Sequence, residues 1–140
     1  MSNRKKKYMS LSGINVVDLP EADLKQQAKA ILDEKIHGIS FSPYGEGQKP
    51  GDLVDKAQIH QRLGVISNNV NWIRSFSCTQ GNQLIPEAAK EMGLKTLVGA
   101  WLNDDLENNE KEIANLIALA KAGLVDIAAV GNEVLLREEL

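Results

Sequence analysis

The chain has 140 residues, of which 43% are hydrophobic and 25% charged, as expected for a soluble globular domain with a core of its own. Sixteen basic and 19 acidic residues give a formal net charge of −3, and four of the basic ones are Arg4 and residues 5–7. Without these four, 12 basic residues stand against 19 acidic ones, a net charge of −7. This balance excludes nucleic acid as the main partner.

Residues 1–10 are predicted to form a basic, disordered tail, and residues 11–140 the folded part. No stretch is long and apolar enough to span a membrane, and no apolar region of a signal peptide follows the basic start. As given, the chain reads as a cytoplasmic protein.

Apolar periodicity divides the folded part into alternating elements. Helices are predicted at residues 21–34, 55–67 and 85–92, from Asn109 onwards, and from Val134 to the end. Asn109 would cap the fourth of these helices in a capping box with Glu112. Strands are predicted at residues 37–44, 70–76, 94–101 and 127–130. The alternation indicates an α/β fold with a parallel sheet and right-handed crossovers.

Four strand–helix units cannot close a (β/α)8 barrel, which needs eight. The chain is therefore predicted to be either an open four-stranded sheet or half of a barrel. A half-barrel leaves two unpaired sheet edges, and these invite pairing with a second half-barrel or with another copy of the chain.

The fourth strand leads to the first candidate site residue. The unbroken apolar run from Ile127 to Val130 predicts a strand buried on both faces. Glu133 follows at its carboxyl end, where α/β folds carry their chemistry. A carboxyl group buried there would hold its proton near neutral pH and act as a general acid. The alternative is a glutamate in the first turn of a helix, favoured by the helix dipole.

Four phrases, in consistent order and spacing from Ile36 to Leu140, resemble one family. They are GISFSPY at residues 38–44 followed by Gly47-Gln48, WIRSFS at residues 72–77, GLKTLVGAWL at residues 93–102, and AVGNEVL at residues 129–135 with Arg137. Together they resemble the amino-terminal half of bacterial glycoside hydrolase family seventeen proteins, which include β-1,3-glucan hydrolases and glucan transglycosylases. The resemblance implies a TIM-barrel type (β/α)8 fold, of which this chain supplies about the first four β/α units.

The resemblance also implies a reaction. Glu133 would be the acid/base of a retaining two-carboxylate mechanism on β-1,3-glucan, by hydrolysis or transglycosylation. The family's nucleophilic glutamate follows the seventh strand, so it lies outside this chain, and we expect residues 1–140 alone to be inactive or nearly so. No cofactor and no metal site is implied. The alternative is a non-catalytic half-barrel that binds carbohydrate or serves in assembly.

Four further residues are predicted to bind the substrate. Asn132 would hydrogen-bond a sugar hydroxyl beside the reacting carbon, or else cap a helix. Arg74, on a buried strand, would reach the cleft or form a structural ion pair. Tyr44 and Trp101 end the first and third strands, where aromatic rings stack on sugars or pack in the core.

Other polar residues are given no part in the reaction. Cys78 is the only cysteine, which excludes an internal disulfide, and it is read as a small apolar residue at a strand end rather than a nucleophile. Asp104 and Asp105 are predicted to be solvated loop carboxylates, and His37, before the first strand, faces the non-catalytic end.

Overall fold

The computed structural model describes residues 18–138, which divide into two compact units between Glu34 and Lys35. The described part of the first unit contains helix α1 (Glu21–Asp33), close to its predicted bounds, with Glu21 and Asp23 in its first turn. The predicted basic tail, residues 1–10, lies outside the described residues. Over residues 18–138, no helix combines the length and apolar character that crossing a bilayer requires.

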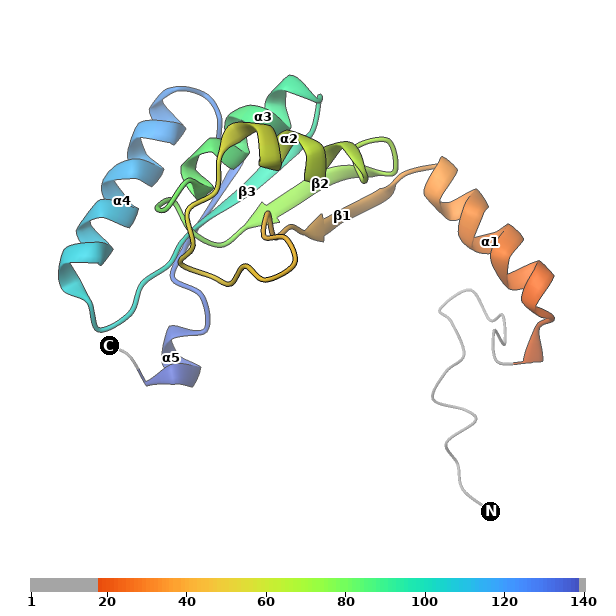
Figure 1. Cartoon of the computed structure of the whole chain (residues 1–140), viewed down its shortest axis with the longest axis horizontal. Coiled ribbons are helices and arrows are strands. Elements are labelled where there is room, and N and C mark those ends of the chain that lie inside the picture. The colour runs from red at the N-terminus through yellow and green to blue at the C-terminus, as the bar shows by residue number, and fades with distance from the viewer. Residues whose placement is uncertain (1–17, 139–140) are drawn as a thin grey trace, which may run out of the picture. The chain divides into compact units, whose positions relative to one another are not determined.

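The second unit alternates strands and helices as predicted. Its elements are β1 (Ile36–Ser40), α2 (Lys56–Gly64), β2 (Val70–Ser75), the 3-10 turn η3 (Asn82–Leu84), α3 (Ile85–Glu91), β3 (Lys95–Ala100), α4 (Leu106–Lys121), β4 (Ile127–Val130) and α5 (Val134–Arg137). All neighbouring strands pair in parallel, in the order β1-β2-β3-β4 (Figure 1). Right-handed crossovers between successive neighbours place the connecting helices on one face, as in a barrel segment.

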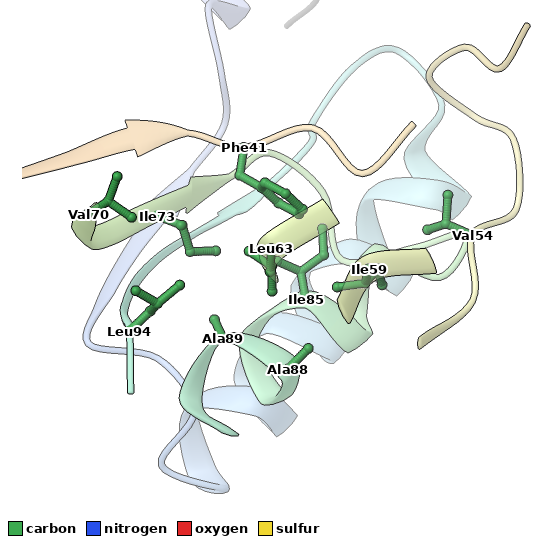
Figure 2. Packing of buried hydrophobic residues seen from close by; sticks show 10 residues of the cluster. All are labelled: Phe41, Val54, Ile59, Leu63, Val70, Ile73, Ile85, Ala88, Ala89 and Leu94. Carbon is green, nitrogen blue, oxygen red and sulfur yellow. The ribbon is translucent and has the colours of Figure 1, made fainter. Parts of the chain in front are cut away.

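The core lies between the sheet and these helices. Ile59 and Leu63 of α2, Ile73 of β2 and Ile85 of α3 are almost fully buried and point into one shared space (Figure 2). A smaller cluster joins β3 to Leu116 of α4. Burial of one apolar stripe per helix therefore fixes α2, α3 and α4 on the sheet.

Within the second unit, the face of the sheet opposite α2, α3 and α4 has a row of side chains that no helix of that unit is packed against. Register aligns Ser40, Arg74, Leu97 and Ile127 in one row across the four strands. Ser40 and Ile127, at the two edges, are exposed, whereas Arg74 and Leu97 are half-buried. In a closed barrel this row would face the interior, which side chains from further strands fill.

The prediction that the fourth strand is buried on both faces is wrong. Ile127 is 48% exposed and Val130 is 68% exposed. The reason is topological, because β4 is at the edge of the sheet and, among the strands within residues 18–138, pairs with β3 alone. An unbroken apolar run indicates a strand suited to the interior, but burial also requires a neighbour on each side.

Helix α4 begins at Leu106, earlier than predicted, and Asn109 does not cap it. Its cap is Asp105, whose Oδ1 accepts a hydrogen bond from the Asn108 amide at 3.0 Å. The Asn109 side chain instead holds the preceding loop, accepting from Asn103 N at 3.0 Å and donating to Asn103 O at 2.7 Å. The expected capping box is therefore absent, and Glu112 has a different role.

Asp126 fastens the start of β4 to its neighbours, and this contact has a pH dependence. Its Oδ2 accepts from Lys90 Nζ at 2.6 Å and from Thr96 N at 2.7 Å. The Lys90 ammonium, followed by the Thr96 amide, holds the pKa of Asp126 below its ordinary value. A depressed folded-state pKa contributes stability above the unfolded-state pKa of about 3.9, and this is lost as pH falls through the folded-state value.

We therefore expect Asp126→Asn to unfold at a lower temperature than the wild type at neutral pH. The difference between the two proteins should shrink as the pH is lowered towards about 2, where both carry a neutral group at this position. Thermal unfolding followed by circular dichroism at both pH values measures this. A difference that stays constant would contradict the assignment.

Candidate active site

A cleft of about 790 Å³ lies at the carboxyl ends of the four strands. This volume is within the range of about 300 to 1,000 Å³ that is usual for small-molecule sites. All five residues singled out by the sequence line it: Tyr44, Arg74, Trp101, Asn132 and Glu133. Parallel strands bring these distant positions to one edge of the sheet, while the part each plays stays a prediction.

One wall of the cleft is the loop between β1 and α2. The strand ends at Ser40, short of its predicted limit at Tyr44, and the chain then turns away from the sheet. Gln58 of α2 holds this loop, since its Nε2 donates to Pro43 O at 2.9 Å. The Tyr44 hydroxyl accepts from Asn82 Nδ2 at 3.1 Å, and the ring packs against the core, so Tyr44 both supports the wall and lines the cleft.

Asn132 is held by two arginines. Arg74 Nη2 donates to its side-chain Oδ1 at 2.7 Å, and Arg137 Nη1 donates to its backbone oxygen. Because an amide oxygen accepts and an amide nitrogen donates, this bond to Arg74 leaves the two Nδ2 hydrogens for another acceptor. The alternative of a helix cap does not occur, since the cap position of α5 belongs to Glu133.

Arg74 lies on β2 and lines the cleft. Its guanidinium lies over the Phe76 ring at 4.7 Å from the centroid, in addition to its bond with Asn132. Its Nε is buried and has no hydrogen-bond partner among the described residues. Arg74 therefore binds the side-chain amide of Asn132. The alternative was a structural ion pair with a carboxylate.

Glu133 lines the cleft, but it is exposed rather than buried as expected. Residues 18–138 therefore do not provide the burial that we expected for this carboxyl group. Its backbone is left-handed, with φ of 54°, a region that non-glycine residues rarely occupy. This backbone turns the chain from β4 into α5 and sets the direction of the carboxylate.

Comparison with known proteins identifies the family of the chain. A family model of the BtgE/BtgC glycoside hydrolase domain matches residues 38–140, which include all four strand ends. The chain belongs to this family. The search of curated proteins with this chain finds no match.

Two solved structures share the fold of this glycoside hydrolase domain. They are the glycoside hydrolase family 17 β-1,3-glucanosyltransferase from Rhizomucor miehei and an active-site mutant of that enzyme in complex with laminaritriose. Each has 22% sequence identity and a TM-score of 0.61, over 77% of this chain and 40% of the other. The glycoside hydrolase domain thus spans less than half the length of these structures, and at this identity the likeness establishes the fold.

Trp101 of the glycoside hydrolase domain has one face of its ring occupied. The Arg137 guanidinium lies 4.2 Å from the ring centroid, and Arg137 Nη2 donates to Leu102 O at 2.7 Å. The indole is half-buried and lines the cleft. The sequence phrase that contains Arg137 gave no sign of this contact, because stacking across two strand ends has no signature in local spacing.

Cys78 is a buried structural residue in this glycoside hydrolase domain. Its Sγ donates to Gly99 O at 3.3 Å, and burial, with a further contribution from the Glu112 carboxylate, raises the pKa of the thiol to about 12. A thiol in this state is a poor nucleophile. Within residues 18–138, no group of three or more His, Cys, Asp or Glu side chains is arranged to hold a metal ion.

Two residues of the cleft were missed by the sequence reasoning. Phe76, which carries the Arg74 guanidinium, was treated only as a strand residue. Glu112 lines the cleft and is 1% exposed. A signal for it existed, since Glu112 lies four positions before the buried Leu116 and so on the apolar stripe of α4, where an acid requires partners.

Proposed function

We propose that this chain is part of a retaining enzyme that acts on β-1,3-glucan, as a hydrolase or a transglycosylase. The observation that carries the proposal is the meeting of Glu133, Asn132 and two aromatic side chains in one cleft of a BtgE/BtgC glycoside hydrolase domain. The four phrases that resemble bacterial family-seventeen proteins support the same substrate. A structural relative was studied with laminaritriose, which also supports it.

In the proposed reaction, Glu133 donates a proton to the glycosidic oxygen as a second carboxylate attacks the anomeric carbon. The leaving sugar departs with the proton, and a covalent glycosyl-enzyme forms. Glu133 then takes a proton from water or from a sugar hydroxyl, whose oxygen attacks the same carbon and releases the enzyme carboxylate. Water gives hydrolysis, and a sugar gives transglycosylation.

Asn132 is proposed to bind the hydroxyl next to the reacting carbon. Arg74 fixes the orientation of its amide, so that Nδ2 donates to the sugar oxygen. The remaining lining is rich in uncharged amide and hydroxyl groups, among them Ser77, Thr79 and Asn108. Such groups suit a neutral polyol better than an ionic ligand.

The nucleophile is proposed to come from a second (β/α)4 half. Retaining enzymes place the two carboxyl groups about 5 to 5.5 Å apart across the scissile bond, so such a second half would have to face this cleft. The edges available for pairing are β1 and β4, and the face of the sheet opposite α2, α3 and α4 would become the barrel interior.

Binding of laminari-oligosaccharides by isothermal titration calorimetry tests the substrate. We expect Trp101→Ala to raise the dissociation constant about tenfold, because a stacking face at the cleft is lost. Trp72→Ala is the matched control, since Trp72 is also half-buried but stacks with His37 on β1, away from the cleft. No binding by the wild type, or equal loss in both variants, would contradict the proposal.

A further inference from the structure

Glu112 is a buried acid that takes no part in the proposed reaction, and its bonds span two segments of the cleft. Its Oε1 accepts from Ser77 Oγ at 2.5 Å and from Thr79 Oγ1 at 2.7 Å. Its Oε2 accepts from Cys78 N at 2.6 Å and from Trp101 N at 3.1 Å. With both oxygens engaged twice and 1% exposure, the carboxylate is fully used by the protein.

The donors come from different parts of the chain. Ser77, Cys78 and Thr79 form the loop between β2 and η3, whereas Trp101 directly follows β3. Asn115, one turn along the same helix face, adds a bond from its Nδ2 to Cys78 O at 2.7 Å. Helix α4 therefore binds the β2–η3 loop through the side chains of Glu112 and Asn115, and the end of β3 through Glu112.

These bonds exclude two simpler roles for Glu112. It does not complete a capping box, because Asp105 caps α4. It is not a second reacting carboxylate of this half, because both of its oxygens already accept two hydrogen bonds from the loop and strand end. What remains is the coupling of the two segments, and both of them line the cleft.

We propose that Glu112 is a positioning residue for sugar binding, which holds the Trp101 indole and the Ser77 and Thr79 hydroxyls in register across the cleft. This inference rests on the proposed function, because it assigns those groups to a sugar. The polarity follows from the bonds: the single hydrogen of Ser77 is directed to Glu112, and its oxygen already accepts from the Thr79 amide at 3.1 Å, so it presents its remaining lone pair to a ligand. Sugar hydroxyls would meet acceptors on this side of the cleft.

Glu112→Gln is the direct test, because glutamine keeps the shape but replaces one acceptor oxygen by a donor NH₂ group. The NH₂ group can be matched only by the Ser77 and Thr79 hydroxyls, which then accept instead of donating, and the loss of the negative charge weakens the bonds from the Cys78 and Trp101 amides to the remaining oxygen. We expect the amides of Cys78 and Trp101 to exchange hydrogen at least about tenfold faster, and the dissociation constant for laminari-oligosaccharides to rise about tenfold. Glu110→Gln makes the same chemical change at an exposed position of α4 and should alter neither.

Leu116→Ala distinguishes a role in binding from a general loss of stability. It removes core packing from the same helix, and Leu116 makes none of the four bonds. If the variant with weaker packing loses binding as much as Glu112→Gln, Glu112 supports the fold only and the inference fails. If Glu112→Gln does not fold, Ser77→Ala keeps the carboxylate and removes one donor. It should still weaken binding, by about threefold, and unchanged binding would overturn the inference.

The amide exchange is read without any ligand, so it separates this inference from the proposed function. A wild type that binds no laminari-oligosaccharide would contradict the proposed substrate and, with it, the sugar-positioning role. Faster exchange at Cys78 and Trp101 in Glu112→Gln would still establish the coupling between the two segments. Unchanged exchange would overturn the coupling even if the wild type binds glucan.

Discussion

Glu133→Gln is expected to lower the turnover of laminari-oligosaccharides by about 10²- to 10⁴-fold, the usual contribution of a positioned general acid or base. The assay needs a complete barrel, with residues 1–140 joined to or mixed with a second (β/α)4 half. Glutamine keeps the size of the side chain and cannot transfer the proton to the glycosidic oxygen. Reducing-sugar release for hydrolysis and product chromatography for transfer measure the effect.

The choice of substrate sharpens this test. In a glucoside with an activated aryl group, that group leaves without being protonated. Glu133→Gln should therefore slow the first step of this reaction much less than it slows cleavage of the natural linkage. Asp104→Asn is the matched control, because Asp104 is another exposed carboxylate, in the loop after β3. Equal activity of Glu133→Gln and the wild type on laminari-oligosaccharides would contradict the assignment of Glu133 as the acid/base.

Gly81→Ala is expected to have the largest effect on folding. Gly81 has φ of 92°, and a Cβ atom there would lie 1.9 Å from the backbone oxygen of Val54. The neighbouring backbone bond from Val54 N to Gln80 O, at 3.1 Å, ties the two loops together at this point. Strain and overpacking together should reduce the free energy of unfolding by about 3 kcal/mol or more.

Gly64→Ala provides the matched control for this prediction. Gly64 is the last residue of α2, and a Cβ atom there would meet nothing within 4 Å. Alanine is the better helix former, so this variant should gain up to about 1 kcal/mol. Urea denaturation of both variants measures the free energies. A Gly81→Ala protein as stable as the wild type would show that the two loops can separate without cost.

Much of the fold follows from local patterns. The strand and helix alternation predicted a parallel sheet, because each amphipathic helix needs a sheet face to cover. Tyr44 reaches the cleft from a loop, because β1 ends at Ser40. The cleft followed from the same pattern, since parallel strands end at one edge, and Trp101 and Glu133 come soon after β3 and β4. These positions could be predicted because they depend only on where elements end.

What the sequence did not predict depends on contacts between distant segments. The exposure of β4 depends on its place at the sheet edge, which periodicity does not encode. The start of α4 depended on a choice between Asp105 and Asn109, both good caps, which was decided by the bonds of Asn109 to Asn103. The bonds of Glu112 to Ser77 and Trp101 likewise appear only when the chain is folded.

The left-handed backbone of Glu133 sets stability and chemistry against each other. This conformation costs a residue with a β-carbon on the order of 1 kcal/mol in conformational free energy, whereas it costs glycine little, and asparagine is often found in it. A library at position 133 sorted for heat resistance alone would therefore enrich these two residues. Such sorting would discard the proposed proton donor, so any thermostabilisation of this domain has to leave position 133 out of the library.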